Sequence, residues 1–167
     1  MATSFHDEIR PPGANPLDLV ERIVSEHEWP FDRPSDQDLS VSVAGSWCDY
    51  HLGFTWAHDL AALQVSCTFD LKVPSRRRSD VHALLALVNE RMWCGHFDLW
   101  SEEALPMFRH VLLLRGSGPT NGQVEDMIEI AITECERFYP AFQFLIWGGK
   151  RPDEALAAAI LETVGEA

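Results

Sequence analysis

One stretch of the chain decides its fold: LSVSVAGSWCDYHLGFTWAHDLAALQVSCTFDL, residues 39–71. Apolar and polar side chains alternate three times within it, which predicts three strands that each bury one face. The apolar positions are Leu39, Val41 and Val43; Tyr50, Leu52, Phe54 and Trp56; and Leu63, Val65, Cys67, Phe69 and Leu71. Turn residues at 45–46 and a longer connection at 57–62 separate the strands. The pattern therefore predicts an antiparallel meander with one face toward solvent.

A helical pattern precedes this meander. Asn15 is placed to cap a helix that starts at Pro16, because proline fits the first helical position. Residues 29–31, Trp-Pro-Phe, are expected to end the helix and to hold its end against the core. Residues 1–14 carry no periodicity and are predicted to be a flexible leader, so the domain is expected to span residues 15–167.

Further elements follow the meander. A second helix is predicted between Ser75, as its cap, and Gly95, as its left-handed C-terminal residue. Two strands follow, one at residues 97–99 and one at 107–114, and a third helix begins near residue 124 and is kinked or restarted at Pro140. A last helix runs from Pro152 to Val164. The predicted fold is a single α+β domain with an antiparallel sheet, in the order α-β-β-β-α-β-β-α plus a C-terminal helix.

Composition limits the partners. The chain has 167 residues, with 13 Lys and Arg against 26 Asp and Glu, and a net charge of -13. This charge repels nucleic acid phosphates and anionic membranes and favours basic partners. The N-terminus lacks the basic start and apolar run of a signal peptide, and the apolar runs are too short to cross a membrane. The four cysteines lie within apolar patterns and are predicted to be buried free thiols, so a cytoplasmic location is expected.

No residue pattern indicates catalysis, a metal or a cofactor. Two groups of possible ligands, near residues 48–58 and 94–98, lie along strands where neighbouring side chains point to opposite faces, so ordinary strand positions are expected. The glycine-rich loop at residues 116–122 follows a strand and opens a helix, where backbone amides can bind phosphate. It lacks the lysine of a P-loop, and a flexible connection is expected. A small-ligand sensor or enzyme that uses this loop remains the alternative function.

Apolar surface exceeds what one sheet needs to cover. The second helix has a broad apolar arc, and the strand at 107–114 is apolar on both faces, so a second copy of the chain is expected to cover part of it. Four tryptophans, at positions 47, 93, 100 and 147, are either core residues or contact residues. The arginines at 76–78 are either solvated or bind an acidic partner. The candidate partner or dimer contacts are Leu87, Trp93, Trp100, Met107, Val111 and Leu113.

Four runs of sequence also resemble a known family. They are WCDY at residues 47–50, HFDLWS at 96–101, MFRH at 107–110, and ERFYPAFQF at 136–144 continuing to Gly149. The chain resembles the YbjN-domain proteins of bacteria over nearly everything from Asn15 to Val164. The resemblance implies a regulator of sensory transduction with a fold like that of type III secretion chaperones.

Such chaperones are small acidic homodimers that bind segments of client proteins, partly by adding a client strand to a sheet edge. The family has no catalytic residues to carry over, and the helix after Pro152 departs from the minimal chaperone pattern. We therefore expect a non-enzymatic, protein-interaction or chaperone-like regulator that forms a homodimer and binds an unidentified protein client.

Overall fold

The first helix forms where its capping residues predict it. In the computed structural model, which describes residues 11 and 13–165, α1 spans Pro16–Glu26. The Asn15 side chain accepts a hydrogen bond of 2.9 Å from the Leu17 amide, and this bond satisfies one of the free amides of the first turn. The rest of the predicted leader, residues 1–10 and 12, lies outside the described residues.

The chain then forms one antiparallel sheet of six strands, in the order β1-β2-β3-β4-β6-β5. The strands are β1 Phe31–Asp32, β2 Asp38–Ala44, β3 Asp49–Ala57, β4 Ala62–Phe69, β5 His96–Trp100 and β6 Leu105–Leu113. The remaining helices are α2 Arg78–Asn89, α3 Asn121–Ile146 and α4 Pro152–Gly165, and short 3-10 turns lie at His58–Leu60 and Ser75–Arg77. The predicted α+β class and the three-stranded meander are confirmed.

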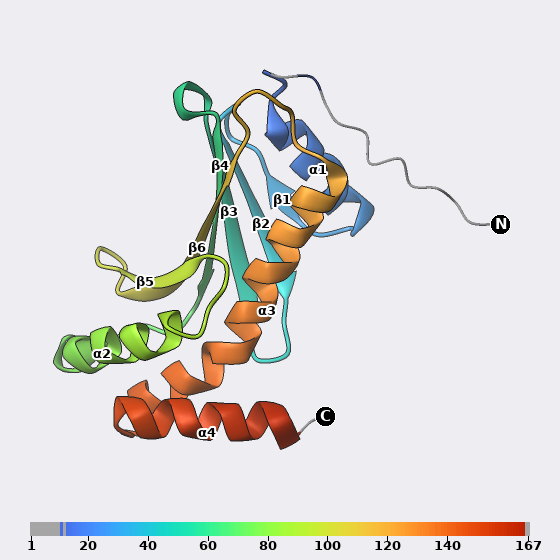
Figure 1. Cartoon of the computed structure of the whole chain (residues 1–167). Coiled ribbons are helices and arrows are strands. Elements are labelled where there is room, and N and C mark those ends of the chain that lie inside the picture. The colour runs from blue at the N-terminus through green and yellow to red at the C-terminus, as the bar shows by residue number, and fades with distance from the viewer. Residues whose placement is uncertain (1–10, 12, 166–167) are drawn as a thin grey trace.

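All helices lie on one side or at one end of this sheet (Figure 1). The helices α1 and α3 cover one face, while α2 and α4 lie together near the end of the sheet where β5 begins. The core fills the space between the sheet and α3, and its aromatic centre includes Phe69, Phe97, Phe138 and Phe142, whose ring centroids are 5.5–5.9 Å apart in the pairs they form. Among the described residues, no helix lies on the other face of the sheet.

The first strand and the ends of two helices differ from the prediction. Residues 29–31 do not simply end α1: Trp29 is half-buried, whereas Phe31 is exposed in β1, a strand too short to give a periodic signal. Ser75 makes no capping hydrogen bond, because the 3-10 turn comes first and α2 starts at Arg78. Gly95 is not a helix end; it has φ +71 in the turn that enters β5.

Several side chains also lie elsewhere than predicted. The helix α3 is not restarted at Pro140 but runs through it to Ile146. Trp47, Trp93, Trp100 and Trp147 are all exposed to some degree, so the core alternative for them is wrong. Cys67 and Cys135 are buried as predicted, whereas Cys48 is half-buried and Cys94 is exposed.

The arginines at 76–78 are not simply a solvated run. Arg77 forms an ion pair of 2.8 Å with Asp80 and donates hydrogen bonds to the carbonyls of Leu145 and Lys150, at 2.6 and 3.0 Å. Arg78 donates to the carbonyl of Ser101 at 3.2 Å. These two guanidinium groups therefore fasten α2 to the α3–α4 connection and to the β5–β6 turn.

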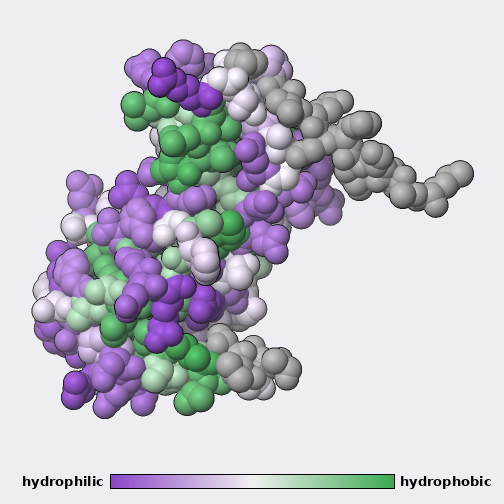
Figure 2. Space-filling view, in the orientation of Figure 1, coloured by the Kyte–Doolittle hydropathy of each residue, from purple (hydrophilic) through white to green (hydrophobic). Residues whose placement is uncertain are grey.

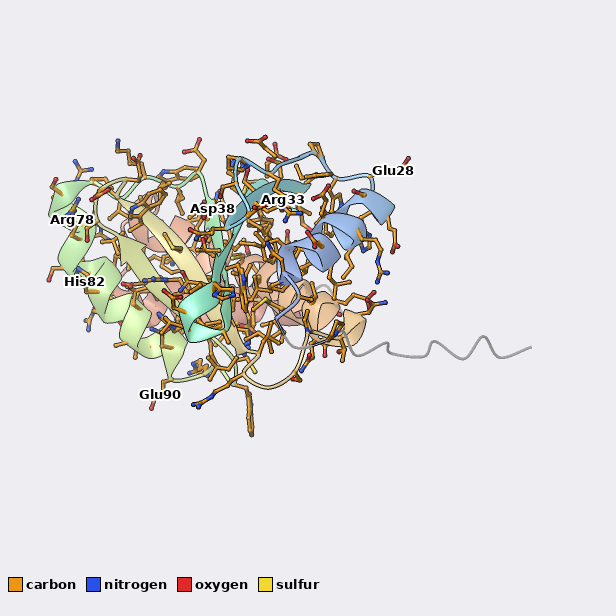
Figure 3. All side chains as sticks on the ribbon, turned by 90° about the horizontal axis from the view of Figure 1, so that it is seen from above. Glu28, Arg33, Asp38, Arg78, His82 and Glu90 are labelled. Carbon is orange, nitrogen blue, oxygen red and sulfur yellow. The ribbon has the colours of Figure 1, made fainter. Side chains whose placement is uncertain are left out.

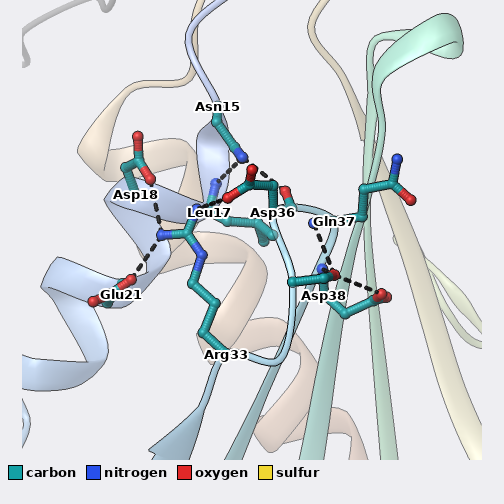
Figure 4. A network of polar contacts seen from close by, with 9 residues as sticks. Asn15, Leu17, Asp18, Glu21, Arg33, Asp36, Gln37 and Asp38 are labelled. Atoms are coloured by element: carbon teal, nitrogen blue, oxygen red, sulfur yellow. Dashed lines mark hydrogen bonds and ion pairs between the residues drawn. The ribbon is translucent and has the colours of Figure 1, made fainter.

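A polar network fastens the β1–β2 segment to α1 (Figure 4). Arg33 pairs with Asp18 at 2.8 Å and with Glu21 at 2.7 Å, and these hydrogen bonds raise the pKa of its guanidinium. Asn15 donates to the carbonyl of Asp36 at 2.7 Å. The segment that carries the first edge strand is thus held against the helix layer.

Candidate functional site

The uncovered face of the sheet is built from the polar half of each strand. The register places Ser40, Gly53, Ser66 and Arg109 side by side across four strands, and it places Ser42, His51, Thr68 and Met107 in the next row. Their side chains all point away from the helices, because the residues between them in sequence are buried. The β2–β4 part of this face therefore carries small neutral side chains.

The β2, β3 and β4 residues of these rows form the floor of a trough with a volume of about 850 Å³. Phe31 stands at the β1 wall, and Trp100 and Met107 stand at the β5–β6 wall. Across the floor, Ser42 Oγ and His51 Nδ1 lie 3.4 Å apart, and Ser66 donates a hydrogen bond of 3.4 Å to the Gly53 carbonyl. The wall also contains an ion pair between Asp98 and Arg109, at 3.6 Å.

Gly53 leaves the centre of the trough free of a side chain, so the trough is deepest there. A glycine inside a strand weakens it and often marks a position where a ligand or another backbone comes close. A Cβ atom at Gly53 would lie 2.9 Å from Ser66 Oγ, which can rotate away, so the glycine is not required by packing against backbone. Core packing therefore does not require glycine at this position, and its effect is on the shape of the exposed face.

Beside the trough, the upper part of the same face is apolar. Leu113 is 74% exposed and Val111 is 41% exposed on β6, and Leu60 is 74% exposed in the β3–β4 turn. Leu113 pairs with Ala62, two residues after Leu60, so these side chains lie at one corner of the sheet. We call Leu60, Val111 and Leu113 the β6 patch. Figure 2 shows green apolar surface over this corner.

The backbone of β6 is bare along the same stretch. The backbone amide and carbonyl of Phe97 in β5 both bond the Asn89 side chain, at 2.7 and 3.0 Å. These two backbone groups therefore face away from β6. Because backbone groups alternate in direction along a strand, the amides and carbonyls of His96 and Asp98 face β6. Those of their partners Arg109 and Met107 therefore face β5.

By the same alternation, the backbone amides and carbonyls of Val111 and Leu113 face the side on which β5 lies. The strand β5 begins at His96, opposite Arg109, and does not reach them. The next residue, Leu114, faces the opposite way, as this alternation requires, because its amide donates to the Ala61 carbonyl on the β4 side at 2.8 Å. Within residues 13–165 no other group pairs with the outward amides and carbonyls of Val111 and Leu113. This part of the β6 edge is an open place for another strand.

The structure brings four of the six predicted contact residues onto one face. Trp100, Met107, Val111 and Leu113 all lie on the uncovered side of β5 and β6. Leu87 does not belong with them, because it is half-buried on α2 and packs against the core. Trp93 is fully exposed in the loop before β5, beside the point where the open edge of β6 starts.

Two contributors were missed from the sequence. Leu60 lies in a turn and Phe31 in a strand of two residues, so neither belongs to a periodic pattern. An apolar residue in an otherwise polar turn was the available signal for Leu60.

The chemistry of the other candidate sites is limited. No group of metal-ligating side chains occurs among the described residues. Burial raises the pKa of the Cys48 thiol to about 11 and also raises the pKa of Cys135, so these thiols are poor nucleophiles.

Two amides where the 116–122 loop enters α3 are already bonded within the protein. The Thr120 hydroxyl accepts from the Gln123 amide at 3.1 Å, and the Gln123 side chain accepts from the Thr120 amide at 3.0 Å. This capping box occupies donors that a phosphate would need.

In the part of the chain that the structure describes, no helix is long and apolar enough to cross a membrane.

These features define the class: an α+β domain with one antiparallel sheet, helices on one face and a bare second face. The chain belongs to the YbjN family, described as "Putative bacterial sensory transduction regulator", whose sequence model matches residues 16–144. The helix α4 lies beyond the matched region.

A solved structure has the same fold. It is the crystal structure described as "YbjN, a putative transcription regulator from E. coli", with a TM-score of 0.56. The two sequences are 13% identical, and the match covers 77% of this chain and 90% of that chain. The likeness therefore concerns the fold alone. No curated protein sequence matches the chain.

Proposed function

We propose that this chain is a non-enzymatic, protein-binding regulator that acts in the cytoplasm, pairs with a second copy through the open edge of β6, and can present that edge to a client strand. One observation carries the proposal. Val111 and Leu113 direct their backbone groups to a side with no neighbouring strand, and their apolar side chains are exposed on the same stretch. An uncovered, apolar edge of this kind is a template for pairing with another chain.

The open segment is complementary to itself. When two copies of β6 run antiparallel about a twofold axis at Leu112, Val111 of each copy faces Leu113 of the other. Both residues point outward, so this register forms four backbone hydrogen bonds. On the uncovered face, each Val111 also lies directly across from a Leu113, at the distance where cross-strand apolar pairs contact each other.

Burial gives the main stabilisation. Fully burying a leucine or valine side chain contributes roughly 1.5–3 kcal/mol, and the four side chains at this interface are only partly exposed to begin with, so they contribute roughly 3–6 kcal/mol together. Association also costs several kcal/mol in lost freedom. A dimer that depends on protein concentration is therefore expected, and Trp93 lies where it can extend the interface.

Charge separates the two kinds of partner. Each copy carries a net charge of -13, so salt should strengthen the dimer by screening the repulsion between the two copies. A client strand with an acidic residue next to two apolar positions would place a carboxylate beside Arg115, and salt should weaken its binding. The sign of the salt dependence thus identifies the partner.

Light scattering on the full chain over a wide range of protein concentration tests the dimer. Leu113→Lys should shift the molecular mass toward the monomer, and Val111→Pro should do so by removing an amide that faces away from β4. Leu161→Lys on α4 is the matched control, because Leu161 is 73% exposed and the charge change is identical. A protein that is monomeric at every concentration, or an equal effect of the control, would refute self-pairing.

A small-ligand sensor is the second candidate, and the trough is the observation that favours it. Its volume of about 850 Å³ lies within the range of small-molecule pockets, and its floor of hydroxyl, amide and imidazole groups suits a polar, uncharged ligand. A thermal-shift screen of sugars and nucleosides, repeated on Gly53→Val, tests this. A stabilising compound that loses its effect in the variant would support the sensor, and a screen without a stabilising compound would contradict it.

A further inference from the structure

A second concave site lies on the helical side of the molecule, away from the uncovered face. It is a groove of about 480 Å³ between the end of α1 and the middle of α3. The groove is lined by Ile23, His27, Trp29, Glu125, Ile128, Glu129, Ile132 and Thr133. Neither the proposed dimer nor the trough uses any of these residues.

The groove combines an apolar floor with an aromatic wall. Ile23 and Ile128 form the buried part of the floor, and Ile132 is half-buried beside them. The Trp29 indole is half-buried and stacks on the His27 ring, with ring centroids 4.3 Å apart and planes 11° from parallel. The stack holds the indole in place at the end of α1, so the aromatic wall is rigid before anything binds.

The rim of the groove is acidic, and its lining contains no lysine or arginine. Glu125 and Glu129 are exposed and lie one helical turn apart on α3. Across residues 13–165 neither of them forms an ion pair within the 4.0 Å limit that other pairs meet. Arg22 of α1 has other partners, because it donates to the Asn121 side chain and pairs with Glu26 at 3.9 Å.

We infer that the α1–α3 groove is a docking site for a basic amphipathic helix of a partner protein. Apolar side chains of that helix would contact the three isoleucines, in the manner of helices that bind hydrophobic grooves. Lysine or arginine residues spaced by four positions would meet Glu125 and Glu129, which have the same spacing. One of these cations can also lie against the Trp29 ring, where the π electrons attract it.

Charge decides against the other occupants. A second copy of this chain carries a net charge of -13, and none of its four described α-helices has a basic residue in its last turn. Nucleic acids and anionic membranes would bring phosphate groups toward two carboxylates without a nearby counter-ion. A basic protein segment relieves the repulsion between Glu125 and Glu129 and also covers the isoleucines.

The groove is independent of the β6 edge. It is formed by α1 and α3, which cover the opposite face of the sheet, so a partner helix bound there leaves Val111 and Leu113 accessible (Figure 1). This inference therefore does not rest on the proposed self-pairing, and the two can fail separately.

The probe is a fluorescein-labelled synthetic peptide with leucine on one helical face and lysine on the other, and binding is followed by fluorescence anisotropy on the full chain. Two control peptides have the same length: one has glutamate in place of lysine, and one has the leucines and lysines scrambled. We expect binding of the amphipathic lysine peptide alone, and its affinity should fall as salt is added.

Matched variants separate the groove from the overall negative charge. The double variant Glu125→Gln and Glu129→Gln should weaken binding by about tenfold or more, since removal of two charge pairs amounts to roughly 1–2 kcal/mol. The control Glu102→Gln and Glu103→Gln changes the net charge equally in the exposed β5–β6 turn and should leave the affinity within about twofold. Ile132→Ser tests the floor and should also weaken binding.

Several results would overturn the inference. Equal effects of the two glutamine double variants would mean that the peptide binds the acidic surface as a whole. Equal affinity for the scrambled peptide would remove the role of the apolar floor. Leu113→Ser should bind the peptide like the wild type, and a loss of binding there would assign the peptide to the β6 edge instead.

Discussion

The replacement Asn89→Ala tests the hydrogen bonds that close the outer edge of β5 at Phe97. Asn89 is the last residue of α2. Its side-chain amide bonds the Phe97 backbone as a neighbouring strand would: it accepts from the Phe97 amide at 2.7 Å and donates to the Phe97 carbonyl at 3.0 Å. The outward direction of Phe97 fixes the direction of every residue in β5 and β6. The Leu114 amide, which bonds the Ala61 carbonyl, gives the same alternation independently, so this variant tests how the outer edge of β5 is closed.

The magnitude follows from the two bonds. Each contributes roughly 0.5–1.5 kcal/mol net, so their loss should reduce the free energy of unfolding by about 2 kcal/mol. With a denaturant slope of roughly 2 kcal/mol per molar urea, the midpoint should fall by about 1 M. The Phe97 amide, which then opens to water, should exchange its hydrogen about 30-fold faster, since tenfold corresponds to about 1.4 kcal/mol.

Urea unfolding followed by circular dichroism and amide exchange measured by NMR supply the two readouts. Asn89→Asp keeps an acceptor for the Phe97 amide but loses the donor to its carbonyl, so it should protect the amide better than Asn89→Ala. Glu90→Ala, at the exposed next residue, is the control for helix-end effects. An unchanged midpoint together with a Phe97 amide that stays protected in Asn89→Ala would refute the reasoning.

Three further predictions concern single residues. Arg77→Met should lower the free energy of unfolding by roughly 2–3 kcal/mol, because charge-assisted bonds to Leu145 and Lys150 are lost, and Arg77→Lys should recover only part of it in urea titrations. Glu28→Gly should raise thermal stability by roughly 0.5–1 kcal/mol, because Glu28, at the outer end of α1 in Figure 3, has φ 57. Burial lowers the pKa of His110, so wild-type stability should fall as the pH drops through the ordinary value of 6.5, and urea midpoints of His110→Leu should fall less.

The sequence predicted the meander well because each of its strands repeats one physical pattern. Leu39, Val41 and Val43 alternate with serines, and every one of them is buried. The same alternation also predicted that Val111 and Leu113 would lack a cover, since a strand that is apolar on both faces has more apolar surface than one helix layer can bury. Periodicity thus identified both the core and part of the candidate site.

Features that depend on contacts between distant segments could not be predicted in this way. The α1–α3 groove joins Trp29 to Glu129 across one hundred residues, and no local pattern links them. The open part of the β6 edge depends on where β5 starts, at His96 opposite Arg109, and on the bonds that join Phe97 to the distant Asn89 side chain. Helix ends were mistaken for a similar reason: a 3-10 turn at Ser75–Arg77 displaced the predicted cap of α2.

The treatment of the other edges makes the bare part of β6 informative. Proteins usually protect sheet edges, because exposed amides and carbonyls pair with other chains. Here β5 is sealed at Phe97 by Asn89, and the Leu99 amide is occupied by the Asp98 carboxylate at 2.8 Å. On the opposite side β2 is covered by β1, and the following loop is held to α1 by Arg33.

A sheet edge without a partner usually carries a charged side chain, and a single lysine on the uncovered face would be enough to prevent pairing. At positions 111 and 113 the chain instead has valine and leucine, next to Leu60 from the adjoining turn. Protection elsewhere and exposure here are the pattern expected when one edge is kept for a partner. The salt dependence of association, which has opposite signs for a second copy and for an acidic client, then decides which partner it is.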